Sequence, residues 1–433
     1  MDYQNDSLEL PVYTPSSPSP SYTCDLAYGE SRLEHTPRTR PAPTSLFIKK
    51  AGKTTIVLNE QEDGAMTPTY GRGATISGNL FLEHSEDILE VTLKVKGKLD
   101  ATTSEVGAQS IKTVDSSCTL WSSSTSRPQR SSCPGQLAFS VSLPTTFTHS
   151  SQSYSLPPTY HAEFFSVTSL FVRSVYTLHF VITRVRHKTL DLWTKTKQIL
   201  IPFKYVPRTR PNRPILPSPC FFSSVKTSPE EWYQAVTPLK TRTESASDPI
   251  YCHLFVPASR IFGLSDTIPF HVQLSGNTCT LRDLFSDIPL DRITSTDSYN
   301  TVASKKPPAQ KPLIHASILR QVTVTVRGAK SFKNSIIAEG TIWPIPPDLS
   351  TCCSSTSECK EGHVDWEGEL RCQSDISVGG FEAANVHVKD FITLTLTPPN
   401  PQTSPLLQLQ ITVPIRLVTE SWGDFAGFDL GSV

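Results

Sequence analysis

The sequence predicts an all-β protein built from two β-sandwich lobes joined by a proline-rich hinge. Short β-like runs recur throughout the 433 residues, and the strip YVPRTRPNRPILPSP at residues 205–219 divides them into two groups. Proline lacks a backbone donor and fixes φ, so a strip this rich in proline cannot lie inside a sheet. We therefore expect a stiff, extended hinge between two lobes, each large enough to bury its own core.

The expected strands show the alternation of half-buried antiparallel sheets. In residues 390–397, for example, Ile392, Leu394 and Leu396 share one face, which is the period of two typical of strands. The expected strands before the hinge are residues 54–58, 74–82, 88–95, 137–143 and 175–185. Those after it are residues 250–256, 267–274, 317–326, 369–372, 390–397 and 406–418.

The other segments complete the expected domain organisation. Residues 102–134, 291–312 and 348–361 are rich in Ser, Thr and Pro and predict surface insertions between strands. The expected order is a disordered tail at 1–45, an N-terminal sandwich at 46–204, a hinge with a short helix at 205–249, a C-terminal sandwich at 250–419 and a short tail at 420–433.

The short helix is expected to begin at Ser228. This residue is followed by proline at the first helical position and by Glu231 three residues after the cap, which is an N-terminal capping pattern. We expect the helix to run through Trp232 and Tyr233 and to stop before Pro238.

Composition favours a cytoplasmic protein. Lys plus Arg and Asp plus Glu each number 40, so no net field attracts nucleic acid or a membrane. The N-terminal residues lack the pattern of a signal peptide, and no apolar run reaches the roughly 20 residues needed to span a bilayer. We therefore expect the ten cysteines to be reduced thiols.

Metal binding and catalysis are not expected. Cys352, Cys353, Cys359 and His363 form a local cluster, but it lacks the paired C-x-x-C spacing of a zinc site, so we expect neither a metal nor a cofactor. The sequence also lacks a G-x-S-x-G elbow, a glycine-rich phosphate loop and an H-E-x-x-H motif. We therefore expect a protein that is not an enzyme.

Several motifs, in their order along the chain, resemble those of fungal arrestin-like proteins related to the α-arrestins. In the first lobe these are GRGATISGNLFLEH at residues 71–84 and LPPTY at 156–160, and in the hinge they are PRTRP at 207–211 and PEEW at 229–232. In the second lobe they are LFVPASRIFGLSDTIPFHVQLSG at 254–276, WEGELRC at 366–372 and GGFEAANVHVKDFITLTLTPP at 379–399. The resemblance covers residues 46–417 and implies two tandem arrestin-type, immunoglobulin-like sandwiches.

The resemblance implies an adaptor function. Arrestin-like proteins bind cytosolic segments of membrane receptors or transporters, and the α-arrestin branch recruits HECT-type ubiquitin ligases whose WW domains take PPxY motifs. Such a protein acts in endocytosis and protein transport and is recruited from the cytoplasm to the plasma membrane or endosomes. The chain departs from the α-arrestin pattern because only a short segment, residues 420–433, follows the second lobe. A retromer-like structural scaffold subunit of a sorting complex is the alternative.

The full PPxY match consists of Pro157, Pro158 and Tyr160, with Thr159 between them. A WW domain requires an exposed polyproline II segment. The alternative is that this segment leads into a strand of the first lobe and that Tyr160 is packed. The segment at residues 10–13, LPVY, is a partial match that lacks the first proline.

The hinge carries a second candidate binding site. Arg208, Arg210 and Arg213 are suited to acidic lipid headgroups or a phosphorylated partner. The alternative is that these arginines form the solvated face of a linker.

Overall fold

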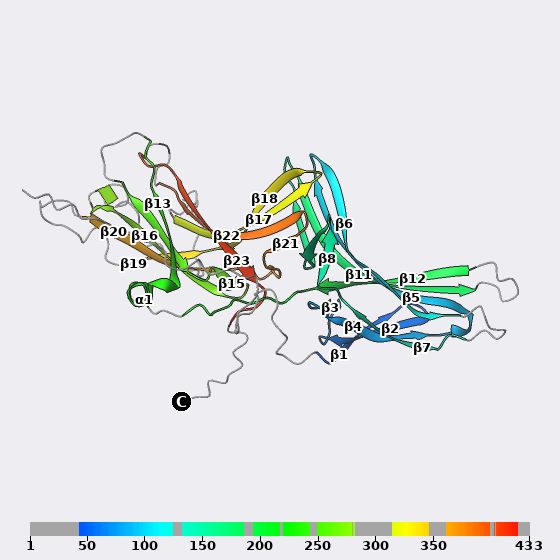
Figure 1. Ribbon diagram of the computed structural model, residues 1–433. Helices are drawn as coiled ribbons and strands as arrows, with labels where there is room; N and C mark the ends of the chain where they lie inside the picture. Colours follow the sequence, from blue (N-terminus) through cyan, green and yellow to red (C-terminus); the bar gives the residue numbers. More distant parts are fainter. Residues whose placement is uncertain are drawn as a thin grey trace, which may run out of the picture. The chain divides into compact units, whose positions relative to one another are not determined.

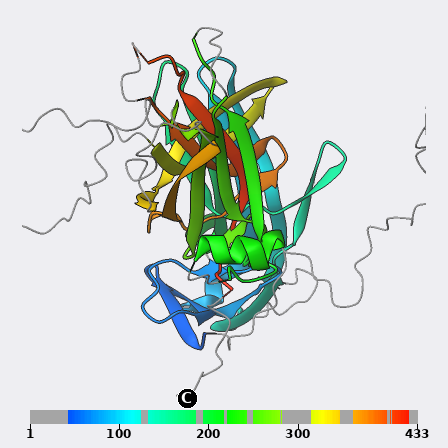
Figure 2. The same cartoon turned by 90° about the vertical axis from the view of Figure 1, so that its left-hand side faces the viewer.

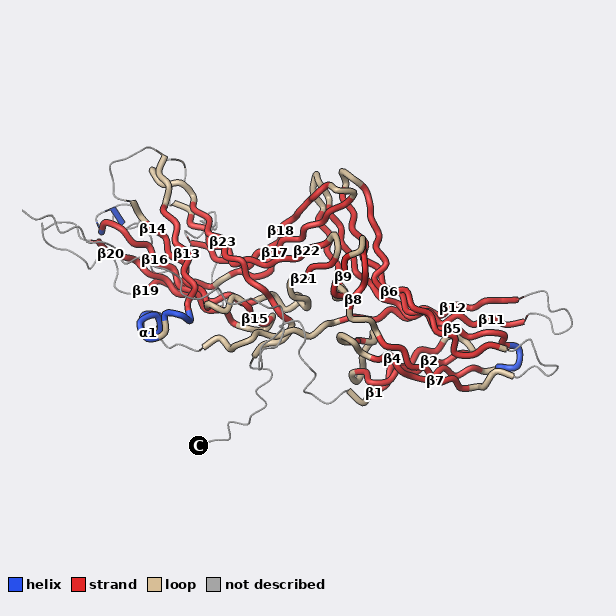
Figure 3. Tube along the Cα trace, viewed as in Figure 1, coloured by secondary structure: helices blue, strands red, loops and turns tan. Residues whose placement is uncertain are grey.

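The computed structural model describes residues 43–422 except for 124–131, 186–193, 217–219, 243–248, 279, 282–313, 346–360, 399–401 and 403. Strands dominate this part of the chain (Figure 3). The all-β prediction is therefore confirmed. None of the helices among the described residues is both long enough and apolar enough to cross a membrane.

Two sheets form what we call the first sheet pair (Figure 1). One has the order β1 (Ser45–Lys50), β2 (Thr54–Gln61), β4 (Thr75–Leu82) and β7 (Gln136–Ser142). The other has the order β3 (Thr69–Tyr70), β12 (Thr194–Tyr205), β11 (Leu170–Val185), β5 (Ile88–Thr103) and β6 (Gly107–Ser122), with β10 (Tyr160–Phe164) beside β11. A short 3-10 helix, η1 (Ser85–Asp87), precedes β5, and β8 (Thr146–His149) pairs with β9 (Gln152–Ser155).

The second sheet pair follows the same plan. Its five-stranded sheet has the order β13 (Trp232–Pro238), β14 (Tyr251–Pro257), β16 (Thr267–Asn277), β20 (Glu361–Arg371) and β19 (Thr341–Ile345). Its six-stranded sheet has the order β15 (Ile261–Gly263), β23 (Leu409–Val418), β22 (Val386–Leu396), β17 (Ile314–Val326) and β18 (Ala329–Glu339), with β21 (Phe381–Ala383) beside β22.

Period-two alternation builds the core between the sheets of each pair. In the first pair, Phe139 of β7 contacts Phe180 of β11 edge-on, with ring centroids 5.3 Å apart. In the second pair, Val272 and Ile392 come from different sheets and are both fully buried in one core. Burying side chains of this size supplies most of the stabilising free energy, about 1.5–3 kcal/mol for each.

Strands β17 and β22 contribute to both cores. The even-numbered residues of β17 are buried on one face, and Ile318 belongs to the core of the second pair whereas Val322 belongs to that of the first. On β22, Val388 belongs to the core of the first pair and Ile392 to the core of the second. The two cores therefore meet along one pair of hydrogen-bonded strands.

Every strand range expected from the sequence overlaps an observed strand, but two other expectations were wrong. The expected insertion at residues 102–134 contains the whole of β6, which pairs with β5 along its length. Most of the Ser and Thr residues of β6 are exposed or half-buried, as polar side chains on the outer face of an antiparallel sheet can be, and only Thr113 is buried.

The expected helix at Ser228 was also wrong. The helix α1 (Phe221–Thr227) ends before Ser228, and residues Pro229–Glu231 form one 3-10 turn, η2. Trp232 and Tyr233 begin strand β13, which pairs with β14. The five-stranded sheet thus starts within residues 205–249, because pairing with a neighbouring strand outweighs the local capping pattern. The expected tail at 1–45 and the insertions at 291–312 and 348–361 lie almost entirely outside the described residues.

Candidate functional site

A buried ion pair marks the place where the two cores meet. Arg320 of β17 and Asp390 of β22 are directly opposite in register, on the face that carries the core residues. The guanidinium donates two hydrogen bonds to the carboxylate, from Nε to Oδ1 (2.7 Å) and from Nη2 to Oδ2 (3.1 Å). The side chains are 5% and 0% exposed. Burial lowers the pKa of Arg320, but the hydrogen bonds and the charge of Asp390 outweigh burial and raise it, so the guanidinium is charged.

The segment that leads into β21 passes close to this pair. A Cβ added to Gly379 would lie 2.1 Å from the carbonyl oxygen of Leu417, and one added to Gly380 would lie 3.3 Å from Oδ2 of Asp390. Two glycines therefore let this backbone pass between β23 and the carboxylate. Nearby, burial and then the charge of Asp390 raise the pKa of the Cys372 thiol to about 11, so this cysteine is a neutral thiol.

The Pro157–Tyr160 motif lies against the same region. Pro157 and Pro158 are buried, and the carbonyl of Pro157 accepts a 2.6 Å hydrogen bond from the Tyr176 hydroxyl. Thr159 is bonded to Tyr205 twice: its N–H donates to the carbonyl oxygen (2.9 Å), and its Oγ1 accepts from the backbone N–H (2.8 Å). These contacts hold the motif along the end of β12, and its prolines are not presented as an exposed polyproline II segment.

Tyr160 joins the two sheet pairs. It is the first residue of β10 and is partly buried, and its ring meets Phe381 of β21 edge-on with centroids 5.2 Å apart. Burial raises the pKa of Tyr160 to about 12, while Arg320 lowers it and Asp390 raises it. The tyrosine is therefore packed beside the ion pair. This arrangement corresponds to the packed alternative considered for the motif.

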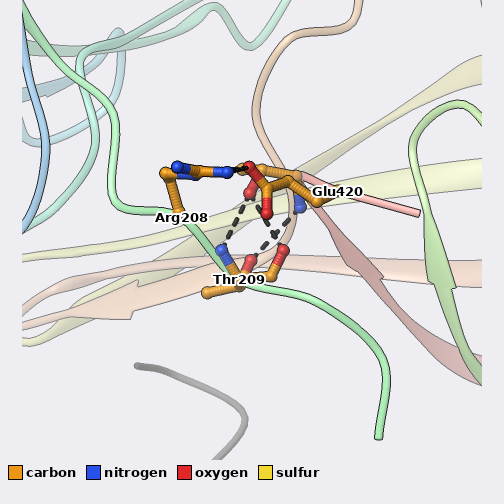
Figure 4. A network of polar contacts seen from close by, with 4 residues as sticks. Arg208, Thr209 and Glu420 are labelled. Carbon is orange, nitrogen blue, oxygen red and sulfur yellow. Dashed lines mark hydrogen bonds and ion pairs between the residues drawn. The ribbon is translucent and has the colours of Figure 1, made fainter. Parts of the chain in front are cut away.

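The proline-rich segment at residues 205–219 is bonded to the residues that directly follow β23 (Figure 4). Arg208 forms an ion pair with Glu420. The backbone N–H of Thr209 donates to Oγ1 of Thr419 (2.8 Å), whose hydroxyl donates back to the carbonyl oxygen of Thr209 (3.0 Å). Residues far apart in sequence are thereby held together by both charge and backbone contacts.

The other two arginines of the proline-rich segment also have partners within the chain. The guanidinium carbon of Arg210 lies 5.7 Å from the ring centroid of Trp422, which is cation–π distance. Arg213 forms an ion pair of 3.3 Å with Glu231. The three arginines are therefore separated among three contacts and do not form one cationic cluster.

A cavity of about 420 Å³ lies between these parts. We call this cavity and the residues around it the junction. Six residues represent its wall: Pro158, Pro207, Thr209, Phe381, Asp390 and Thr419. The cavity is lined by one residue of the PPxY motif, Pro158, by Asp390 of the ion pair and by part of the proline-rich segment. None of the three candidate arginines of that segment is in its lining. The volume of this cavity, and its mixture of polar and apolar residues, are suited to binding a few side chains of a partner protein.

The remaining candidates do not join this site. Cys352, Cys353 and Cys359 lie outside the described residues, and His363 lies 3.5 Å from Asp365 of the same strand. Among the residues that the structure describes, no three His, Cys, Asp or Glu side chains are grouped to hold a metal ion.

The ion pair itself was missed by the sequence analysis. A signal is present, because Arg320 interrupts an apolar alternation between Ile318 and Val322. Asp390 does the same between Val388 and Ile392. Two interruptions of opposite charge in neighbouring strands would have indicated a buried pair.

No family model matches the chain, and none of the curated proteins matches it in sequence.

Proposed function

We propose that the chain is a non-enzymatic, arrestin-like adaptor that links cytosolic segments of membrane receptors or transporters to ubiquitination and endocytic trafficking. The observation that carries this proposal is the junction, where two β-sheet cores meet on shared strands around the Arg320–Asp390 pair. The order of the arrestin-like sequence motifs supports the same class of protein, with two tandem arrestin-type sandwiches and the proline-rich segment as their hinge.

Shared strands provide a physical basis for an adaptor. β17 and β22 each place residues in both cores, so the two sheet pairs cannot separate without breaking continuous strands. A protein bound to one sheet pair is then held near a protein bound to the other, which raises the effective concentration of each for its partner. Membrane cargo on one side and a trafficking factor on the other would use this property.

Ligase recruitment is the most restricted part of the proposal. Pro157 and Pro158 are buried and Tyr160 packs on Phe381, so a WW domain cannot engage this motif in the described conformation. We therefore propose that a HECT-type ligase docks elsewhere, with residues 10–13 as one candidate, or through a second protein.

The variant Tyr160→Ala tests this restriction. We expect the unaltered chain not to bind isolated ligase WW domains. We expect the variant to lose about 2 kcal/mol or more of unfolding free energy, because Tyr160 is a partly buried, packed aromatic side chain. Isothermal titration with WW domains and urea unfolding measure the two quantities, with exposed Tyr251→Ala as the matched control. Tight WW binding that Tyr160→Ala abolishes without loss of stability would show that the motif is a working ligand.

The buried motif also keeps a second candidate function open. A retromer-like scaffold needs no ligase motif and assembles permanently with other coat-like subunits. Affinity purification of the tagged chain from native cytoplasm separates the two. An adaptor should bring down receptors or transporters in variable amounts together with a ligase, and a scaffold should bring down one constant stoichiometric partner. Recovery of the chain alone would contradict both.

A further inference from the structure

The outer face of the five-stranded sheet carries a row of functional side chains that the junction does not use. Phe255 of β14 is opposite His271 of β16, His271 is opposite Glu367 of β20, and Glu367 is opposite Trp343 of β19. Directly opposed residues point to the same face of a sheet. An aromatic ring, an imidazole, a carboxylate and an indole therefore stand side by side across four strands.

Helix α1 covers only one end of this row. The helix, drawn as the coiled green ribbon in Figure 2, lies across this face of the sheet. Phe221 stacks on His271 with centroids 3.7 Å apart and planes 9° apart, and it also contacts Phe255 edge-on at 4.9 Å. The other end of the row, at Glu367 and Trp343, is left outside the helix.

A cavity of about 810 Å³ occupies that open end. Two tryptophans with indole rings, Trp343 and Trp422, line it and are 40% and 38% exposed. The apolar residue Leu216 also lines it and is 54% exposed. Glu367 and Glu369 point to the same face of β20 and line the cavity. Neither carboxylate has a hydrogen bond or ion pair with any other described residue.

His271 is a second, independent observation that points to a ligand at this cavity. The residue is 1% exposed and lines the cavity. Its Nε2 is 2.8 Å from Oδ1 of Asp365, a carboxylate that accepts, so Nε2 is the donor, and in that tautomer Nδ1 is an acceptor. Nδ1 is buried and has no hydrogen-bond partner among the described residues. A buried acceptor left without a donor is unfavourable, and a ligand with N–H groups would supply that donor.

We propose that this cavity binds the guanidinium group of an arginine side chain in a partner peptide. Arginine combines a positive charge for Glu367 and Glu369, five N–H donors for carboxylate and imidazole acceptors, and a flat face that stacks on indole rings. The chain itself shows that Trp422 accepts a guanidinium, because Arg210, which does not line the cavity, lies 5.7 Å from the centroid of its ring. The inference is independent of the adaptor proposal, since it rests on a different face of the molecule.

The test uses the full chain and a capped hexapeptide with two central arginines. A matched control peptide carries citrulline in place of both arginines, because citrulline has nearly the same shape but no charge. A second control peptide carries lysine at the same two positions. Isothermal titration should show binding of the arginine peptide at least ten times tighter than binding of either probe. Tryptophan fluorescence should change on the same titration, because indoles line the cavity.

Two variants locate the site. Glu367→Gln keeps the side-chain size and should weaken the arginine peptide about tenfold, and Trp343→Leu should do the same. Glu339→Gln, an exposed carboxylate at the end of β18, is the control and should leave binding unchanged. Circular dichroism and the thermal midpoint confirm that each variant is folded. Equal binding of the arginine and citrulline peptides, equal binding of the lysine peptide, no binding at all, or full affinity in both site variants would overturn the proposal.

Discussion

Replacing Asp390 by asparagine removes one charge of the buried pair while keeping the shape of the side chain. Arg320 keeps its positive charge, because a guanidinium does not lose its proton in a protein. The variant therefore leaves an unpaired cation where the parent has a bidentate ion pair with side chains 5% and 0% exposed. This substitution isolates the energetic role of the junction.

The expected loss is about 3–5 kcal/mol of unfolding free energy, which is the usual cost of removing one partner from a buried pair. A Coulomb estimate agrees, since unit charges about 4 Å apart at an effective dielectric constant of about 20 attract by about 4 kcal/mol. The double variant Arg320→Met with Asp390→Leu joins the two apolar cores and should be as stable as the parent or more stable, by up to about 4 kcal/mol.

Urea unfolding followed by circular dichroism measures the loss. With an m value of about 3 kcal/mol/M, the midpoint of Asp390→Asn should fall by about 1 M or more. Amide hydrogen exchange should rise in β11 and in β16 together, because β17 and β22 link the two cores. A loss below about 1 kcal/mol, or faster exchange confined to the second sheet pair, would refute the reasoning.

Two further predictions test the packing around the pair. Gly379→Ala should lower the unfolding free energy by about 1–3 kcal/mol, because its Cβ would lie 2.1 Å from a backbone oxygen. The control Gly71→Ala, whose Cβ would have its nearest neighbour at 3.8 Å, should not change it. Equal stabilities of the two variants in urea would contradict the close approach at Gly379. Burial raises the pKa of Tyr160 and of Tyr205 to about 12, whereas an unfolded tyrosine ionises near 10. The folded chain thus retains protons that the unfolded chain loses, so the stability they contribute is complete below about pH 10 and is lost as the pH rises from about 10 to 12. Unfolding free energies and phenolate absorbance across this range check the sign. The loss should be smaller in Tyr160→Phe, and phenolate formed by Tyr160 near pH 10 in the folded chain would contradict it.

Strand positions could be predicted from the sequence because alternation is a local property. Ile392, Leu394 and Leu396 show their common face within a few residues of chain. The prediction of an insertion at β6 failed because serine and threonine occur both in loops and on the exposed face of a sheet. The capping pattern at Ser228 failed for a related reason, because the ladder between β13 and β14 forms more hydrogen bonds than one helical turn.

The candidate site could be predicted only in part. Pro157, Pro158 and Tyr160 were singled out by their motif, but exposure of that motif depends on Phe381 and Tyr205, which come from other strands. The hinge arginines were identified from their charge, and their partners in the chain could not be, because Arg208 and Glu420 are 212 residues apart.

The sequence by itself determined that this protein is all-β, because period-two alternation and the distribution of proline act over neighbouring residues. Only the tertiary structure decided which side chains meet. Arg320 and Asp390 are 70 residues apart, and the register of β17 on β22 brings them together at the boundary between two cores. The register across β14, β16, β20 and β19 likewise assembles the row from Phe255 to Trp343. Strand register depends on the whole sheet, because a shift of one residue turns every side chain to the opposite face.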